Sequence, residues 1–311
     1  MPKATPPKLD LIKMLTYMRP EGSAAQTAFN QTYLEPFMGL PDLDGNYIHI
    51  EGSNPTIAFM AHHDTVHSKS GTQRLHIDGK GTVTAKNSDC LGADCTTGVW
   101  LILNMIKNKI PGLYIIHAAE EEGCIGSRAI VDRAPVWLEG IEAAISFDRR
   151  DTDSIVTHQM GMRTASDEFA HSLATVLNDP YLQPDPTGSY TDSNEYAHII
   201  PECTNLSVGY YDQHTQHESQ SLPFAYDLLD RLLEADWSQL DICRDPSARE
   251  YENYWSPRTP LSRSLMAELV GDYPDEVANL LASYGITTMS LFEELGLVPD
   301  QNDLDRMEEY A

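Results

Sequence analysis

Apolar residues occur along this chain in short, nearly continuous runs, and the segments between the runs place apolar residues at helical spacing. Residues 56–61 (TIAFMA), 113–119 (LYIIHAA) and 143–147 (AAISF) are typical of strands buried on both faces of a sheet. Because strands alternate with helices over most of the chain, the pattern predicts a three-layer α/β sandwich with a mostly parallel, mixed sheet. Further strands are expected at 46–52, 154–158 and 204–210.

Helices are expected between these strands. The segment from about 94 to 108 carries its apolar residues on one side. Ser166 and Ser221 are placed to cap helices that reach about 177 and 237. The remaining elements indicated by the pattern are helices at about 9–19 and 23–38, a hairpin turn at Asp78-Gly79-Lys80-Gly81, and a short helix after the turn-rich residues 123–127.

The C-terminal part of the chain differs from the rest in composition. Residues 244–260 are polar and contain proline, so they are interpreted as a linker between a main domain at 1–243 and an extension at 261–311. The extension has the pattern of three short helices and contains two Arg against eleven Asp and Glu. Two interpretations stay open: a tail that packs on the main domain or on a second copy, forming a homo-oligomer, or a module that recruits another protein.

Charge and cysteine content narrow the function. The formal net charge of −26 argues against unaided binding to nucleic acid or to a membrane, since both require clustered Lys and Arg. The sequence has no run of 18 or more apolar residues and its start lacks a signal-peptide pattern, so neither a membrane span nor export is expected. The five cysteines show no CxxC spacing, which is typical of reduced thiols in a cytoplasmic protein.

Residues that can bind metal ions or carry protons follow four of the expected strands. In parallel sheets, ligands bind beyond the carboxyl ends of the strands, so these side chains are expected near one another. A fifth segment, Leu91–Gly98, contains Asp94 at the start of a helix. The four strand-end segments contain His62 with Asp64, the triplet Glu120-Glu121-Glu122, Asp148, and His214 within 213–218.

The chemistry of these segments fits a metal site. An imidazole can bind an ion while a nearby carboxylate fixes its tautomer, as His62 and Asp64 would do. Three consecutive glutamates repel one another, but a bound dication holds one ionised while its neighbour accepts a proton. Glycines around Asp94 indicate close approach of the backbone to a ligand, and its carboxylate could bridge two ions.

Each segment also has an ordinary explanation. His-x-Asp often occurs by chance, Asp94 is a suitable helix cap, and three glutamates suit a solvated loop. Asp148 could pair with a neighbouring Arg at the surface, and the segment around His214 could be a polar loop. The occurrence of all five segments together, four of them at strand ends, favours the metal site.

The order of the motifs (HxD, GAD, EExG, a strand-end Asp, HTxxE) resembles that of the co-catalytic zinc exopeptidases of clan MH, the aminopeptidase and carboxypeptidase families. The resemblance covers about residues 55–237 and does not extend to the C-terminal region. It implies a phosphorylase/hydrolase-like sandwich and two divalent metal ions, with zinc expected and manganese or cobalt as substitutes. The ligands that it implies are His62, Asp94, Glu121, Asp148 and His214.

The resemblance also implies how these ligands are shared. Asp94 would bridge the two ions. His62 and Asp148 would complete the ligands of the first ion. Glu121 and His214 would complete those of the second, which makes residues 1–243 a dinuclear metal hydrolase domain.

The implied reaction is hydrolysis of a terminal amide bond of a peptide by a water molecule between the two ions. Glu120 would act as the general acid/base, and Asp64 would orient His62. Only 66 residues separate Asp148 from His214, too few for the lid or dimerisation domain of larger carboxypeptidase-like members. An aminopeptidase-like architecture is therefore favoured.

Two other functions stay open. An amidase or deacylase acting on N-acyl amino acids, or a carboxypeptidase, would use the same site, and Arg149 and Arg150 could bind the substrate carboxylate. An inactive, metal-stabilised scaffold would instead recruit a partner through its acidic extension. Measured turnover and metal content separate these alternatives.

Several residues near the motifs have no single assigned role. Cys95 stands where the family commonly has a second Asp, and the Asp94–Cys95 peptide bond is expected to be cis, as it often is in the family. Residues 190–193 (YTDS) resemble a turn near the family's active site, and are interpreted either as part of the substrate-binding surface or as a surface loop. The histidines expected to line the site without binding metal are His63, His67 and His217.

Overall fold

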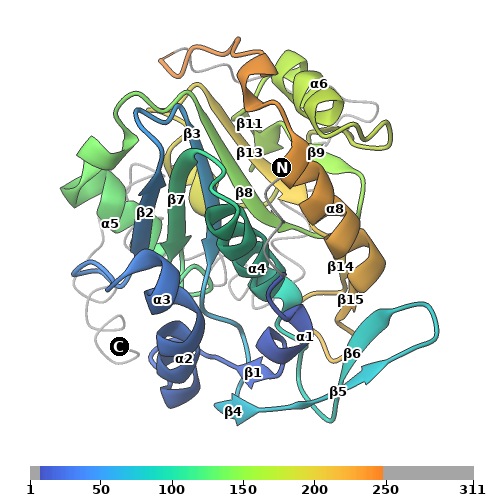
Figure 1. Cartoon of the computed structure of the whole chain (residues 1–311). Helices are drawn as coiled ribbons and strands as arrows, with labels where there is room; N and C mark the ends of the chain where they lie inside the picture. The colour runs from blue at the N-terminus through green and yellow to red at the C-terminus, as the bar shows by residue number, and fades with distance from the viewer. Residues whose placement is uncertain (1–7, 248–311) are drawn as a thin grey trace, which may run out of the picture. The chain divides into compact units, whose positions relative to one another are not determined.

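A seven-stranded sheet runs through the computed structural model, which describes residues 8–247 (Figure 1). Four pairs of neighbouring strands are parallel, β12/β9, β13/β8, β8/β3 and β3/β7, while β9/β13 and β7/β2 are antiparallel. The prediction of a mostly parallel, mixed sheet is therefore confirmed. In order across the sheet the strands are β12 (Gln183–Asp185), β9 (Ser154–Val156), β13 (Glu202–Ser207), β8 (Ala143–Arg149), β3 (Ile57–His62), β7 (Gly112–His117) and β2 (Tyr47–Glu51).

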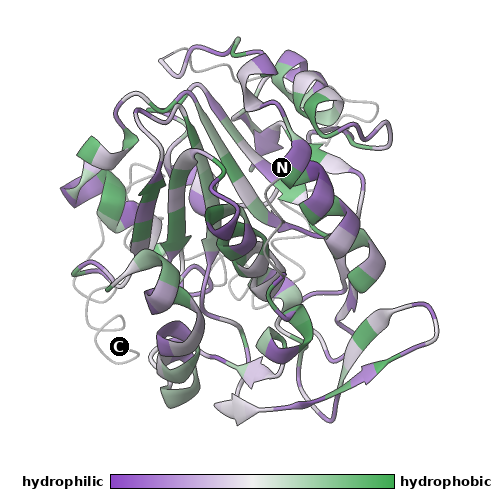
Figure 2. Cartoon of the chain, viewed as in Figure 1, coloured by the Kyte–Doolittle hydropathy of each residue, from purple (hydrophilic) through white to green (hydrophobic). Residues whose placement is uncertain are grey.

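Alternate residues of the inner strands face two opposite layers of helices. On β3, Phe59 and Ala61 pack in the cluster that contains α4 and α8, whereas Ala58 and Met60 pack with α5 and the end of α7. Figure 1 shows α4 and α8 in front of the sheet, and Figure 2 shows the apolar colouring of the strands behind them. The three-layer prediction is confirmed. The longer helices are α4 (Ala93–Lys107), α5 (Ile125–Arg133), α6 (Asp167–Val176) and α8 (Leu222–Glu234), with α1 (Leu11–Met14) and α7 (Asp192–Glu195) shorter.

A second, smaller sheet holds the segment that contains His214. Its strands pair in the order β14-β15-β6-β5, and all pairs are antiparallel. The predicted hairpin turn joins β5 to β6, because the Asp78 carboxylate accepts hydrogen bonds from the N–H groups of Lys80 (2.8 Å) and Thr82 (2.9 Å). The strands are β5 (Arg74–Ile77), β6 (Thr82–Lys86), β14 (Tyr210–Tyr211) and β15 (Ser219–Ser221).

The N-terminal elements differ in part from the prediction. Only α1 forms within the helix expected at 9–19, and the C-terminal half of that prediction is wrong. Tertiary pairing prevails there, since β1 (Tyr17–Met18) pairs with β4 (Gly71–Thr72). The helix expected at 23–38 forms as three consecutive pieces, α2 (Ala24–Phe29), a π-helical turn (Asn30–Leu34) and α3 (Glu35–Met38).

Two predicted helix caps are confirmed. The hydroxyl of Ser166 accepts a hydrogen bond from Phe169 N (3.1 Å), and that of Ser221 accepts one from Phe224 N (3.4 Å). α8 ends at Glu234, slightly before the expected position. The remaining described elements are the strands β10 (His158–Gln159) and β11 (Met162–Arg163) and the 3₁₀ turns Pro135–Leu138 and Trp237–Gln239.

The chain is anchored at the amino edge of the sheet close to residue 247. Glu202, the first residue of β13, accepts hydrogen bonds from the N–H groups of Cys243 and Arg244, each at 2.8 Å. The extension at 261–311 and most of the linker lie outside the described residues, so the proposed domain boundaries stay predictions. Within residues 8–247, no helix combines the length and the apolar character needed to cross a membrane.

Candidate active site

All seven residues expected in the site lie together at the carboxyl edge of the main sheet. His62 ends β3, Asp148 lies near the end of β8, and Glu120 and Glu121 follow β7 by a few residues. Asp94, the second residue of α4, lies beside them, and the loop between β14 and β15 supplies His214. The parallel strand order therefore brings together segments that are far apart in the sequence, as the carboxyl-edge rule predicts.

The carboxylate of Asp94 lies between two imidazoles. Its Oδ1 is 3.0 Å from His62 Nε2, and its Oδ2 is 3.2 Å from His214 Nε2. A further carboxylate approaches each imidazole: Asp148 Oδ1 lies 3.5 Å from His62 Nε2, and Glu121 Oε1 lies 2.9 Å from His214 Nε2. The site thus consists of two nitrogen–oxygen donor sets that share one carboxylate.

Asp64 lies behind this arrangement and is almost fully buried. Its Oδ1 is 3.3 Å from His62 Nδ1, the ring nitrogen that faces away from Asp94. The same carboxylate accepts hydrogen bonds from the N–H groups of Glu120 (3.2 Å) and Glu121 (3.0 Å). Asp64 therefore fixes both the imidazole ring and the backbone turn that carries the glutamates.

Glu120 lies beside the two donor sets, with its side chain 12% exposed. Its Oε2 lies 3.9 Å from His62 Nε2, and the Cys124 thiol donates to its Oε1 at 3.7 Å. Burial raises the pKa of Glu120 well above its usual range. Burial, followed by the charge of Asp94, raises the pKa of Asp148 to about 7. Both shifts favour the protonated forms of these carboxyl groups, and a cation nearby would oppose them.

For the shared carboxylate and the imidazole of His214, the pKa shifts favour the charged forms. Burial opposes ionisation of Asp94, but hydrogen bonds from His214 and His62 outweigh it and lower the pKa of Asp94. Burial also opposes protonation of His214, yet Asp94 and Glu121 raise its pKa to about 11. The site therefore attracts positive charge strongly, and this donor chemistry fits divalent cations.

Asp148 is held by residues that sequence reasoning did not single out. Its backbone N–H donates to Asn205 Oδ1 (2.9 Å), and Asn205 Nδ2 donates to its carbonyl oxygen (2.8 Å). The hydroxyls of Thr191 (3.1 Å) and Tyr210 (3.3 Å) donate to its carboxylate. The YTDS turn therefore lies at the site, and Thr191, Asp192 and Ser193 are buried rather than part of a surface loop.

The Asp94–Cys95 peptide bond is cis, as expected. The Cys95 thiol is buried and donates to the carbonyl oxygen of Phe147 at 3.1 Å. Sequence reasoning also missed Glu218, which is 1% exposed and accepts hydrogen bonds from the backbone around Asp94. Its position in the HTxxE motif, four residues after His214, was the available signal.

The other histidines and arginines near the motifs have varied surroundings. His63 and His67 are 3% and 2% exposed, so they are buried and do not line an open cleft, whereas His217 is exposed. Arg149 donates to Asp185 Oδ2 at 2.8 Å, which occupies part of its guanidinium group. The side chain of Arg150 is 52% exposed, with Nε 3.4 Å from Asp151.

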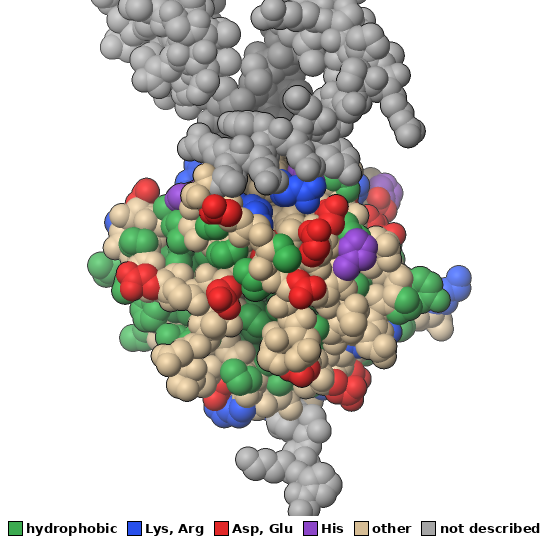
Figure 3. Space-filling view, turned by 90° about the horizontal axis from the view of Figure 1, so that it is seen from above, with side chains coloured by type: hydrophobic (Ala, Val, Ile, Leu, Met, Phe, Trp, Pro, Cys, Tyr) green, Lys and Arg blue, Asp and Glu red, His purple; other side chains and the backbone are tan. Residues whose placement is uncertain are grey.

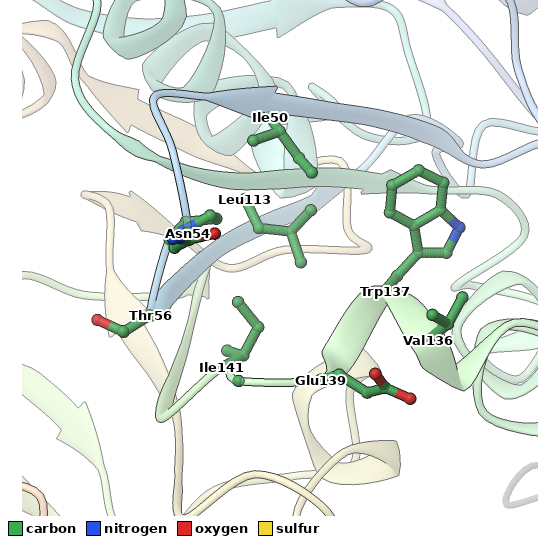
Figure 4. Close-up of a pocket in the computed structure, with 10 residues that line it drawn as sticks. Ile50, Asn54, Thr56, Leu113, Val136, Trp137, Glu139 and Ile141 are labelled. Carbon is green, nitrogen blue, oxygen red and sulfur yellow. The ribbon is translucent and has the colours of Figure 1, made fainter.

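A surface pocket of about 590 Å³ lies at the opposite edge of the sheet (Figure 4). Thr56 and Leu113 in its lining stand at the start of β3 and β7, whereas the candidate ligands stand at or beyond the strand ends. Ile50 and Trp137 complete an apolar wall. This pocket is therefore separate from the candidate active site.

Comparison with known proteins shows the fold. No protein-family profile matches the sequence, and no curated protein matches it. Among solved structures, a tripeptidase from Staphylococcus aureus subsp. aureus Mu50 is 13% identical, with a TM-score of 0.57 over 72% of this chain and 95% of that chain. Aminopeptidase PepT from Bacillus cereus is 14% identical, with a TM-score of 0.58 over the same shares.

The Pyrococcus horikoshii TET1 peptidase is 13% identical, with a TM-score of 0.58 over 73% of this chain and 100% of that chain. It can assemble into a tetrahedron or a large octahedral shell. These similarities confirm the aminopeptidase-like fold that the motif order implied.

Proposed function

We propose that this chain is a metal-dependent exopeptidase of the aminopeptidase type, acting on the terminal amide bond of small peptides. The observation that carries the proposal is Asp94, whose two oxygens face His62 and His214 at 3.0 and 3.2 Å. A carboxylate shared by two nitrogen–oxygen donor sets suits a pair of divalent cations. Solved structures with this fold include a tripeptidase and aminopeptidases, which supports the same class of reaction.

The donor atoms support zinc as the metal, with manganese or cobalt as substitutes. When bound, two such ions would polarise the scissile carbonyl group and lower the pKa of a water molecule. The residues that would hold them are His62, Asp94, Glu121, Asp148 and His214.

Glu120 would carry the proton. Its side chain is close to His62 but lies outside the two donor sets that share Asp94. A buried carboxyl group with a raised pKa is suited to proton transfer near neutral pH. Glu120 would take a proton from the attacking water and return it to the leaving amine. Asp64 would keep this base in place through the N–H group of Glu120.

Arg150 supports a second candidate function. It lies two residues beyond Asp148 and is half-exposed, so its guanidinium group can bind a substrate carboxylate. A deacylase acting on N-acyl amino acids, or a carboxypeptidase, would use such a contact. Arg149 gives less support, because Asp185 already engages it.

The test combines metal analysis with an activity screen of the full chain. Protein stripped with chelator would be reloaded with zinc, manganese or cobalt and assayed on aminoacyl-anilides, tripeptides and N-acyl amino acids. We expect about two ions per chain and hydrolysis of the first two substrate classes. Hydrolysis of N-acyl amino acids alone would favour the deacylase, and tight metal binding without turnover would favour an inactive scaffold. A metal content near zero after reloading would overturn the proposal.

We further propose a cytoplasmic protein that forms an assembly of several copies. Reduced thiols suit the cytoplasm, and the structure pairs none of the five cysteines with another. The assembly of the structurally similar TET1 peptidase supports oligomerisation, for which we propose the acidic extension at 261–311 as a contact. Light scattering of the full chain would measure the number of copies.

A further inference from the structure

Glu218 is a buried carboxylate at the base of the loop that carries His214. It is 1% exposed, whereas the His214 side chain is 46% exposed. The loop between β14 and β15 contains internal hydrogen bonds. For example, the Thr215 hydroxyl donates to Asp212 O (2.7 Å), and Glu218 N donates to Thr215 O (3.1 Å). Such bonds shape the loop but do not fix where it stands relative to Asp94.

The Glu218 carboxylate makes that connection with four hydrogen bonds. Its Oε2 accepts from the N–H groups of Leu91 (2.8 Å) and Gly92 (2.9 Å). Its Oε1 accepts from the N–H groups of Ala93 (2.7 Å) and Asp94 (3.1 Å). These charge-assisted bonds occupy the amide groups at the start of α4, where the helix dipole also favours a negative charge. One side chain therefore clamps the whole turn that presents Asp94.

Gln220, two residues after Glu218, binds α4 about one turn beyond Asp94. The Thr97 hydroxyl donates to Gln220 Oε1 at 2.6 Å, and Gln220 Nε2 donates to Val208 O at 3.0 Å. Glu218 directly precedes β15 and Gln220 lies within it, and both side chains reach α4. The base of the His214 loop is thus attached to the element that carries Asp94.

The clamp places Glu218 near the Asp94 carboxylate, which is an unfavourable neighbour. The Asp94 N–H group donates directly to Glu218 Oε1, so these two acidic residues are in contact. A neutral side chain could cap these amides without this repulsion. The charge is consistent with a role in holding cations, because a negative charge beside Asp94 favours positive charge in the site.

We propose that Glu218 is the positioning residue for the second metal ion: by clamping residues 91–94, it sets the separation between His214 and Asp94. The inference rests on the proposed dinuclear site. It concerns the half of that site formed by Asp94, Glu121 and His214. In the other half, Asp64 holds His62, and Asn205, Thr191 and Tyr210 hold Asp148.

The test is Glu218→Gln in the full chain, which keeps the size but removes the charge and turns an N–H group towards backbone donors. Titration calorimetry and metal analysis would measure the affinity of each zinc ion. We expect one of the two ions to lose about 10–100-fold in affinity while the other changes little, the range for removing a partner of a metal ligand. At a zinc concentration that just fills both sites of the wild-type protein, the number of ions bound per chain would fall from two towards one.

Glu202→Gln is the matched control. Glu202 is also a fully buried carboxylate that accepts backbone N–H bonds, from Ser166 (2.7 Å), Cys243 and Arg244, but at the opposite edge of the sheet. It should lower the midpoint of thermal unfolding to a similar degree and leave both zinc affinities unchanged. This control separates lost positioning from lost stability.

Two further variants keep the inference testable if Glu218→Gln does not fold. Glu218→Asp keeps the charge but is one methylene shorter, so it should show a smaller loss for the same ion. In a His214→Ala background, Glu218→Asp should leave the affinity of the remaining ion unchanged. If wild-type protein binds two ions and the Glu218 variants bind both with wild-type affinity, this inference alone is overturned. Wild-type protein that binds none would overturn the proposed function as well.

Discussion

Glu120 and Glu121 are adjacent in the chain, and the structure gives them different surroundings. Glu121 faces His214 at 2.9 Å, whereas Glu120 lies 3.9 Å from His62. We predict that Glu120→Gln keeps both metal ions but lowers kcat by at least about 100-fold, the lower range for a positioned acid/base. Steady-state kinetics and metal analysis of the same preparation would measure the two effects.

Glu122 provides the control for this substitution. It belongs to the same acidic triplet but is exposed, so Glu122→Gln should leave kcat within about twofold, in keeping with the small effects of exposed changes. Near-normal turnover in Glu120→Gln would remove Glu120 from the mechanism. Loss of metal together with turnover would instead make it a ligand.

The sequence was sufficient to select the candidate ligands, because each stands in a short motif, at or shortly after a strand end or, for Asp94, at the start of a helix. It was not sufficient for the residues that hold them. Asn205 contacts Asp148 from 57 positions away, and Glu218 reaches Leu91 across 127 positions. Such contacts depend on which strands become neighbours, and the local hydrophobic pattern does not determine the order of strands across a sheet.

At the scale of elements, the site depends on how closely α4 approaches the sheet. Gly98 makes this approach possible, since a Cβ atom there would lie 2.2 Å from Phe147 O and 3.1 Å from the Cβ of Ala61. The carbonyl belongs to backbone in β8 and cannot move aside easily. We predict that Gly98→Ala destabilises the protein by about 1–3 kcal/mol despite the better helix propensity of alanine. Urea unfolding would measure the loss.

Gly79→Ala is the matched control, because no atom lies within 4 Å of a Cβ built at Gly79 in the hairpin turn. It should change the free energy of unfolding by less than about 0.5 kcal/mol. Equal stability of Gly98→Ala and wild type would mean that α4 can shift away from β8 at little cost, and that the close approach is not required.

The elements themselves were predictable to different degrees. The apolar runs that became β3, β7 and β8 were found because a strand covered on both faces has no polar positions. The segment after α1 was mistaken for helix because its own pattern is helical, while its conformation is set by pairing with β4. In the core the local hydrophobic pattern therefore predicts the secondary structure, whereas for the segment after α1 pairing with a distant strand determines it.

At the scale of the whole molecule, the acidic side chains on the face seen in Figure 3 do not form a single patch. Figure 3 shows Asp and Glu side chains scattered across one face rather than gathered in one patch. The chain carries a net charge of −26, and its candidate site contains carboxylates that lie close to one another. Bound cations would relieve the repulsion within the site, so metal removal should affect the stability of the entire domain.

The stability of the metal-free protein depends on pH with a definite sign. In the metal-free protein, Asp148 keeps a proton up to about pH 7 that the unfolded chain releases near 3.8. His214 likewise keeps a proton up to about pH 11 that the unfolded chain releases near 6.5. Between pH 6 and 9 the folded state therefore binds more protons than the unfolded state, and its stability falls as pH rises.

Bound metal reverses this dependence, because metal ligands must release their protons and the ions bind more tightly as pH rises. We therefore predict that the unfolding midpoint of chelator-treated protein falls from pH 6 to 8.5, while its difference from zinc-loaded protein widens. Differential scanning calorimetry of both forms across this range would measure the difference, and His214→Ala should reduce the slope of the metal-free form. A difference that stays constant or narrows with rising pH would mean that metal ions do not replace protons at His214 and Asp148.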